Sequence, residues 1–257
     1  MRYLCYLDPE SGRAVYGWAE GARVGPIDGL LLGPHRRLPA SLPVDSLQLR
    51  APIAPSKIVC VARNYAAHAR EQQEPVPEVP MLFLKPPSAL LASGEEIELP
   101  PQSKQVEHEA ELAVVIARRA RWISPDQAGE YIFGYTAAND VTARDLQHRD
   151  GQWARAKGFD TFCPLGPWIE TELDPADLRI LCRVNGQVRQ LASTLDMIFP
   201  VTQLVAYISS IMTLYPGDVL LTGTPAGVGR LEGGDQVDVE IQGIGVLRNR
   251  VALAAAS

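Results

Sequence analysis

The sequence lacks the features of membrane, secreted and nucleic-acid-binding proteins. Its 257 residues include no apolar run near the ~20 residues that cross a bilayer, and Asp8 interrupts the first apolar stretch too early for a signal peptide. The formal net charge of −6 leaves no excess of positive charge for nucleic acid. Four scattered cysteines without a Cys-x-x-Cys spacing indicate reduced thiols and a cytoplasmic protein. We therefore expect neither a membrane nor a nucleic acid as a partner.

Turn-forming residues are abundant instead. The chain has 21 Gly and 21 Pro, which favours a strand-rich fold with many turns. Short strand patterns fill residues 1–52, and we predict a small N-terminal β domain there. Residues 53–257 are long enough to enclose a large core, and they form the predicted main domain. Within it we predict a hairpin over residues 179–190, with a type I′ turn at Asn185-Gly186. We also predict an amphipathic helix over residues 200–212 whose apolar stripe lies in the core, namely Leu204, Val205, Ile208, Ile211 and Met212.

Two neighbouring glutamates mark residues 106–116, which read as one β-strand because the β-branched run Val114-Val115-Ile116 closes it. On a strand, residues two apart point to the same face, so Glu109 and Glu111 project side by side. Unpaired carboxylates are costly to bury. They either stay in water, which is the commoner case for charged residues, or they share a proton, meet cations or hold a metal.

A third carboxylate, Asp140, lies at the end of the aromatic, β-branched strand pattern of residues 131–139. Asp140, Arg144 and Gln147 are spaced as one face of a helix. Asp140 could cap that helix with Arg144 as its partner, or it could complete an acidic site with the two glutamates.

Residues 64–71 have strong helix formers, with Asn64 as a plausible N-cap. His68 and Glu71 share a helix face, either as a surface pair or as an imidazole that a carboxylate orients. The proline-rich residues 72–80 that follow are a candidate lid.

Two lysines and a glycine-rich loop carry further candidates. Lys85 ends a strand over residues 81–85, and Lys157 enters a Gly/Pro loop. Each lysine is either a solvated charge or an anchor for an anionic substrate. Residues 223–229 form a glycine-rich loop without the ending of a P-loop, and its backbone N–H groups could approach a ligand carboxylate.

The order of these motifs resembles the fumarylacetoacetate hydrolase superfamily, over about residues 53–252. The resemblance includes the small N-terminal domain of its bacterial acylpyruvase and hydroxymuconate-isomerase branch. The motifs that carry it are Arg63-Asn64-Tyr65-x-x-His68-x-x-Glu71, Phe83-Leu84-Lys85-Pro86, His108-Glu109-x-Glu111-Leu112, Asp140-x-x-x-Arg144-Asp145-x-Gln147, Lys157-Gly158-Phe159-Asp160, Leu165-Gly166-Pro167, Asp196-Met197-Ile198-Phe199 and Gly223-Thr224-Pro225-x-Gly227-Val228-Gly229.

The resemblance implies an α+β, β-rich fold, a mixed β-sandwich roll, and a homodimer. It also implies that Glu109, Glu111 and Asp140 are metal ligands. Three hard oxygen ligands favour Mg²⁺ or Mn²⁺, with Ca²⁺ also compatible, over zinc.

The resemblance assigns roles to further residues. His68 and Glu71 match a catalytic dyad that activates water or moves a proton. Lys157, Gln147 and Thr224 match residues that hold the substrate, and Arg144 lies near them or braces Asp140.

The expected activity is hydrolysis of a C–C bond in a β-diketo acid of the acylpyruvate or fumarylacetoacetate type. The small-molecule substrate would chelate the metal as a keto acid, and the ion would stabilise enolate charge. The same logic supports decarboxylation of oxaloacetate-like acids or isomerisation of a 2-hydroxyhepta-2,4-diene-1,7-dioate. A non-catalytic keto-acid-binding protein on the same fold is the remaining alternative.

Overall fold

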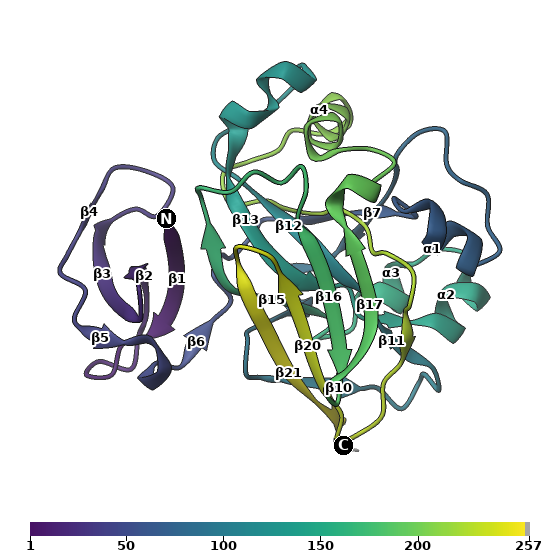
Figure 1. Ribbon diagram of the computed structural model, residues 1–257, viewed down its shortest axis with the longest axis horizontal. Helices are drawn as coiled ribbons and strands as arrows, with labels where there is room; N and C mark the ends of the chain where they lie inside the picture. Colours follow the sequence, from purple (N-terminus) through teal and green to yellow (C-terminus); the bar gives the residue numbers. More distant parts are fainter. Residues whose placement is uncertain (255–257) are drawn as a thin grey trace.

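The computed structural model describes residues 1–254, and its N-terminal strands form a small lobe of their own (Figure 1). A small apolar cluster around Leu4, Tyr6 and Val24 fills this lobe. One pairing joins it to the rest, because β1 runs antiparallel to β15 at Arg2 and Tyr3. The boundary of an N-terminal domain at residue 52 stays a prediction. The strands of this lobe are β1 (Arg2–Leu7), β2 (Ala14–Glu20), β3 (Arg23–Gly29), β4 (His35–Arg37), β5 (Leu42–Pro43) and β6 (Leu49–Arg50).

A large sheet forms the centre of the main lobe, in the order β1-β15-β13-β12-β18-β7-β8. Its central strand β12 reads Ala-Glu-Leu-Ala-Val-Val-Ile, and all seven residues are buried. β18 pairs with β7 in parallel, whereas β12 pairs with its neighbours in antiparallel orientation, so the sheet is mixed. Its main-lobe strands are β7 (Ile58–Ala62), β8 (Met81–Lys85), β9 (Leu90–Leu91), β12 (Ala110–Ile116), β13 (Ile132–Asn139), β15 (Cys163–Glu170) and β18 (Val219–Leu221).

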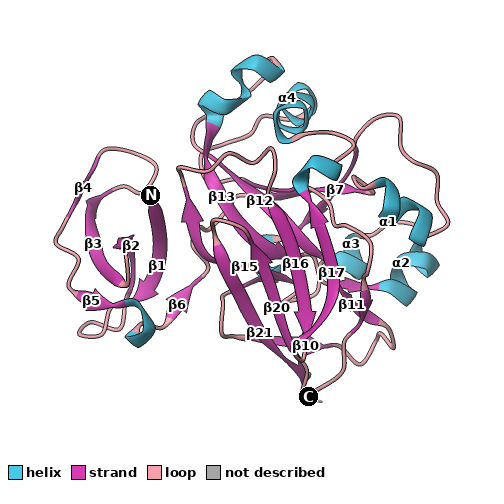
Figure 2. Cartoon of the chain, viewed as in Figure 1, coloured by secondary structure: helices cyan, strands magenta, loops and turns pink. Residues whose placement is uncertain are grey.

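A five-stranded sheet packs on one face of this centre (Figure 2). Successive side chains of β12 point to opposite faces of the sheet and so contribute to two apolar clusters. Leu112 and Val114 join one cluster with residues of the second sheet, while Ala113 and Val115 join a cluster on the other face. The predicted β-rich sandwich is confirmed. The second sheet contains β10 (Glu96–Leu99), β21 (Gly245–Leu253), β20 (Gln236–Ile241), β16 (Arg179–Val184) and β17 (Gln187–Ser193).

The hairpin prediction is also confirmed. β16 and β17 pair in antiparallel orientation, and positive φ values of 53° at Asn185 and 77° at Gly186 give the expected turn.

Four α-helices complete the described part of the chain: α1 (Ala66–Glu71), α2 (Arg144–Asp150), α3 (Ala154–Lys157) and α4 (Val201–Ile211). The first three gather at one end of the sheets (Figure 1). α4 buries Leu204, Val205 and Ile208 as predicted, but Ile211 is 49% exposed, so its predicted place in the core is wrong. None of the described helices has the length and apolar character needed to cross a bilayer.

The predicted single strand over residues 106–116 is wrong, because it breaks at Glu109. β11 (Val106–His108) belongs to a small sheet with β14 (Thr142–Ala143) and β19 (Gly229–Arg230), whereas β12 belongs to the large sheet. At the break, the Glu109 N–H donates to Asn139 Oδ1 at 2.9 Å, and the Glu109 carbonyl accepts from the Asp140 N–H at 2.8 Å. The chain therefore changes sheets at its first predicted ligand.

Candidate active site

Three carboxylates from two adjacent strands meet at this break. Glu109 lies at it, Glu111 lies in β12, and Asp140 follows β13. The antiparallel register pairs Ala110 with Asn139, which delivers the distant aspartate to the two glutamates. One oxygen of each carboxylate lies within 4.8 Å of the other two, and all three residues are at most 4% exposed. The alternative of glutamates in water is therefore wrong.

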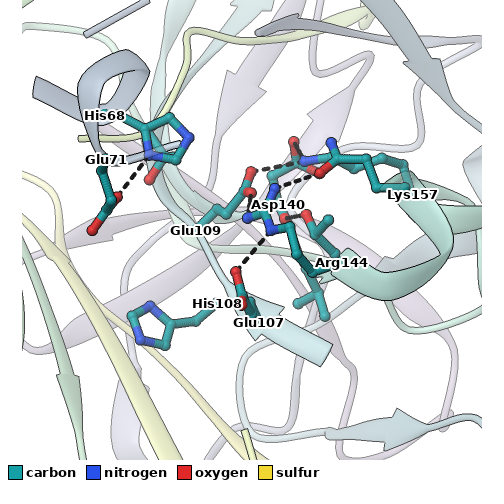
Figure 3. A network of polar contacts seen from close by, with 12 residues as sticks. His68, Glu71, Glu107, His108, Glu109, Asp140, Arg144 and Lys157 are labelled. Atoms are coloured by element: carbon teal, nitrogen blue, oxygen red, sulfur yellow. Dashed lines mark hydrogen bonds and ion pairs between the residues drawn. The ribbon is translucent and has the colours of Figure 1, made fainter. Parts of the chain in front are cut away.

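Basic side chains pair with two of these carboxylates (Figure 3). Lys157 Nζ donates to Glu109 Oε2 and Asp140 Oδ2, each at 2.7 Å. Lys85 Nζ donates to Asp140 Oδ1 at 2.7 Å. Arg144 donates to Glu109 and, at 2.8 Å, to Glu107 Oε2. Both lysines are thus buried counter-charges and not solvated surface groups.

Glu111 is the carboxylate without a basic partner among residues 1–254. It accepts a hydrogen bond from the Gly223 N–H at 2.6 Å. Burial, followed by the negative charges of Asp140 and Glu109, raises the pKa of Glu111 well above its ordinary value. Burial acts the same way on Glu109, but there the charges of Lys157 and Arg144 outweigh it and lower the pKa. The protonated form of Glu111 is consequently favoured as long as no positive charge lies beside it.

The residues fit a divalent cation. The buried cations Lys85, Arg144 and Lys157 face four buried carboxylates, those of the cluster and of Glu107. Counted as formal charges, the carboxylates exceed the cations by one. The donor set consists of carboxylate oxygens, which Mg²⁺, Mn²⁺ and Ca²⁺ prefer. A divalent ion would reverse the sign of the local charge and favour an anionic ligand.

The predicted dyad lies beside the cluster (Figure 3). His68 is 5% exposed, and its Nδ1 lies 3.0 Å from Glu71 Oε2. Glu71 Oε1 in turn accepts from the Gly227 N–H at 2.8 Å. The imidazole is therefore fixed to the glycine-rich loop through its carboxylate partner.

One pocket of about 230 Å³ collects the predicted residues. Eight of the nine line it, and Glu71 lies behind His68. Arg144 Nη1 donates to Gln147 Oε1 at 2.5 Å, and the Thr224 hydroxyl donates to the Ala110 carbonyl at 2.9 Å. The lining residues among the nine are His68, Glu109, Glu111, Asp140, Arg144, Gln147, Lys157 and Thr224.

Two local predictions are wrong. Asn64 does not cap α1: Tyr65 holds that position, and the Asn64 side chain instead donates to the carbonyls of Phe199 and Thr222. Asp140 precedes α2, which Ala143 caps, so Asp140 shares no helix face with Arg144. Each error replaces a local contact with a long-range one.

Sequence analysis did not assign Glu107, Lys85 or Gln190 to the site. Glu107 and Glu109 are two residues apart and share one face of the predicted strand, and Lys85 is a cation at a strand end. The sequence therefore carried an indication that these two residues could belong to the site. Gln190 had none. It is fully buried, its Oε1 accepts from the Ala110 N–H, and its Nε2 donates to Thr224 Oγ1 at 2.8 Å. It thereby fixes the glycine-rich loop to β12.

The chain is similar in sequence and fold to known proteins. The model of the family "Fumarylacetoacetate (FAA) hydrolase C-terminal" matches residues 57–252. The solved 2-hydroxyhepta-2,4-diene-1,7-dioate isomerase from Mycobacterium marinum is 44% identical, with a TM-score of 0.91 over 100% of both chains.

Two further relatives carry other names. Fumarylpyruvate hydrolase from Pseudomonas aeruginosa, solved with Mn²⁺ and pyruvate, is 37% identical, with a TM-score of 0.74 over 80% of this chain and 92% of that one. A mitochondrial oxaloacetate tautomerase from Bos taurus is 46% identical over 233 residues, 84% of this chain and 74% of the relative.

Proposed function

The chain belongs to the fumarylacetoacetate hydrolase family, and from this membership we propose that it is a divalent-metal-dependent hydrolase of β-diketo acids. The observation that carries the proposal is one pocket that holds both the buried Glu109, Glu111 and Asp140 cluster and the His68–Glu71 pair. The neighbour solved with Mn²⁺ and pyruvate supports the metal and the class of ligand. The homodimer and the cytoplasmic location stay predictions.

Glu109, Glu111 and Asp140 would hold the cation, Mg²⁺ or Mn²⁺ in our proposal, with Ca²⁺ also compatible with the oxygen ligands. When bound, the ion supplies Lewis-acid stabilisation of the negative charge that develops on a 2-oxo acid. Lys85, Lys157 and Arg144 place positive charge against the oxygens of Glu109 and Asp140, and the charges of Lys157 and Arg144 lower the pKa of Glu109.

His68 is the proposed general base. Since the Glu71 carboxylate can only accept, the Nδ1 of a neutral His68 carries the proton and Nε2 keeps its lone pair. Nε2 takes a proton from water, and the hydroxide adds to the distal carbonyl of the substrate. The C–C bond then breaks, its electron pair leaves with the pyruvate fragment as an enolate, and a proton from His68 completes pyruvate beside a carboxylic acid.

Lys157, Gln147, Arg144 and Thr224 are proposed to orient the substrate. Lys157 adds a buried positive charge to the pocket, and Arg144 fixes the Gln147 side chain. The hydroxyl proton of Thr224 is already donated to the Ala110 carbonyl. Any hydrogen bond from Thr224 to the substrate would therefore come from its backbone N–H.

A second candidate is proton transfer without cleavage, as isomerisation or tautomerisation, with decarboxylation of oxaloacetate-like acids as a variant. Relatives named isomerase and tautomerase, 44% and 46% identical, favour it. The same His68–Glu71 pair can move a proton between carbon and oxygen. Both candidates need the same enolate, so product identity separates them.

The test is turnover of acetylpyruvate, oxaloacetate and 2-hydroxyhepta-2,4-diene-1,7-dioate with Mg²⁺ or with a chelator. Loss of enol absorbance is followed together with chromatography of the products. Hydrolysis predicts pyruvate and acetate from acetylpyruvate, with loss of activity in the chelator and in Glu109→Ala. Full activity in Glu109→Ala contradicts the metal mechanism. Metal-dependent binding of these acids without turnover supports a non-catalytic binding protein instead.

A further inference from the structure

One cation of the pocket wall takes no part in the carboxylate cluster. In the described part of the chain, Arg63, Arg144 and Lys157 are the arginine and lysine side chains that line the pocket. Arg144 and Lys157 are bound to the buried carboxylates. Arg63 pairs with Glu74 in the loop after α1, with Nη1 2.7 Å from Oε2. Arg63 is thus the pocket cation whose charge is not used by the proposed metal site.

The hydrogen bonding of Arg63 is incomplete. Its Nε is buried and has no partner in the described structure, and its Nη2 lies 3.1 Å from the Met81 sulfur, a weak acceptor. Nε and Nη2 form the edge of a guanidinium that a carboxylate binds with two parallel hydrogen bonds. A buried donor without a partner is costly, so this arrangement favours the arrival of an oxygen acceptor.

The present partner of Arg63 is easily replaced. The Glu74 side chain is 53% exposed, and an ion pair with so exposed a partner contributes little to stability. The Glu74 backbone is fixed, because its N–H donates to the Ala69 carbonyl of α1 at 2.9 Å. The Glu74 carboxylate can therefore move into water while its main chain remains attached to the helix that carries His68.

The main chain of Arg63 is held in an unusual conformation. Its φ of 56° lies in the left-handed region, which is uncommon for a residue with a Cβ and tends to occur at functional sites. The next residue, Asn64, is fully buried and bound to Phe199 and Thr222. Arg63 thus combines a fixed backbone with a side-chain tip that can change partners.

The pocket continues past Arg63 into a second hollow. Arg63, Phe83 and Trp153 line both cavities, and the two aromatic rings meet edge to face at 5.3 Å. These rings offer an apolar wall to a carbon chain. A ligand that extends from the carboxylate cluster would therefore pass along them to the Arg63 guanidinium.

We propose that Arg63 selects 2-oxo acids that carry a second carboxylate at the far end of the chain, and that this carboxylate binds the Nε–Nη2 edge against the opposing charge of Glu74, which binds Nη1. The proposal rests on the proposed function, since the 2-oxo acid end must bind at the carboxylate cluster. Hydrogen bonds to charged groups are stronger than those between neutral groups, and repulsion by the Glu74 carboxylate offsets part of the gain. We expect a net preference of about tenfold for the dicarboxylic acid.

The test uses pairs of 2-oxo acids that lack the scissile β-diketone. 2-Oxoglutarate is compared with 2-oxopentanoate, and 2-oxoadipate with 2-oxohexanoate, by calorimetry in the presence of Mg²⁺. Wild type should bind the dicarboxylic member of at least one pair about tenfold more tightly. Arg63→Ala should lose this preference and keep the affinity for the monocarboxylic member. The exposed Arg70→Ala on α1 removes the same charge and should behave as wild type.

Glu74→Gln separates selection from a structural role of the pair. Removal of the competing carboxylate should raise the affinity for the dicarboxylic acids, opposite in sign to Arg63→Ala. If the pair only fixes the loop, both variants weaken binding, and the proposal is wrong. Equal affinities of wild type for both members of each pair overturn this proposal alone. Failure of all four acids to bind overturns the proposed function as well.

Discussion

The two walls of the pocket hold their charges in different ways. On the inner wall, Glu109, Asp140 and Lys157, together with Lys85 behind Asp140, are at most 4% exposed, and each charge has at least one partner of opposite sign. On the outer wall, formed by α1 and the loop that follows, the carboxylates of Glu71 and Glu74 are 31% and 53% exposed.

This difference in burial distinguishes charges that the folded state needs from charges that only the activity needs. A buried pair that loses one member leaves an uncompensated charge in a medium of low dielectric constant. A half-exposed pair that loses one member gains water instead. Changes on the inner wall should therefore affect folding and activity together, whereas changes on the outer wall should affect activity or selectivity alone.

The largest effect is expected for Lys85→Met. This substitution keeps the volume of the side chain and removes the buried ammonium group that donates to Asp140 Oδ1. We expect a loss of about 3–5 kcal/mol in the free energy of unfolding. Urea denaturation in metal-free buffer measures it. A loss below about 1 kcal/mol would show that Asp140, which still pairs with Lys157, tolerates the loss of its second lysine as an exposed pair would.

His68→Gln should lower kcat at least about 100-fold and leave the melting temperature unchanged, because proton transfer is lost while the ligand carboxylates remain. Steady-state kinetics and thermal denaturation of the same preparation check both statements. Metal affinity, measured by calorimetry with Mn²⁺, is the control and should equal that of wild type. A melting temperature that falls as far as that of Lys85→Met would contradict the separation of the two walls.

Glu111→Gln and Glu109→Gln should differ in sign on stability. Glu111 has no basic partner in residues 1–254, so its neutralisation should leave the metal-free protein equally stable or more stable. Glu109→Gln leaves Lys157 and Arg144 short of a counter-charge and should destabilise. Both variants should bind Mn²⁺ at least about tenfold more weakly, as seen by calorimetry. Equal destabilisation by both variants would show that the Glu111 carboxylate is paired with a positive charge, as the Glu109 carboxylate is.

The smallest effect is expected for Arg36→Met in the N-terminal lobe. Arg36 and Asp28 pair at 3.0 Å, but their side chains are 75% and 62% exposed. Loss of this pair should change the free energy of unfolding by less than about 1 kcal/mol and should not alter turnover. Urea denaturation under the conditions used for Lys85→Met gives the comparison, and a similar cost in both variants would contradict it.

The sequence predicted elements whose signal is local. The hairpin turn at Asn185-Gly186 and the buried face of α4 follow from residue type and spacing alone. The three carboxylates were grouped through a resemblance in the order of motifs, and the structure brings them within reach of one another. Their role as metal ligands stays a prediction.

The failures have a common physical cause. The strand break at Glu109, the side-chain contacts of Asn64 and the burial of Lys85 all depend on partners at least 30 residues away in the sequence. Single-residue preferences carry no information on such pairings. Gln190 shows this most clearly, because a glutamine on a strand reads as a surface residue until β17 is packed against the glycine-rich loop.

Diffraction at a wavelength that gives an anomalous signal from manganese, on crystals soaked in Mn²⁺, tests the central claim most directly. We predict one strong anomalous peak bounded by the carboxylates of Glu109, Glu111 and Asp140, absent from crystals of Glu111→Gln. A protein that turns over its substrate in a chelator and gives no peak among these three residues would contradict the account.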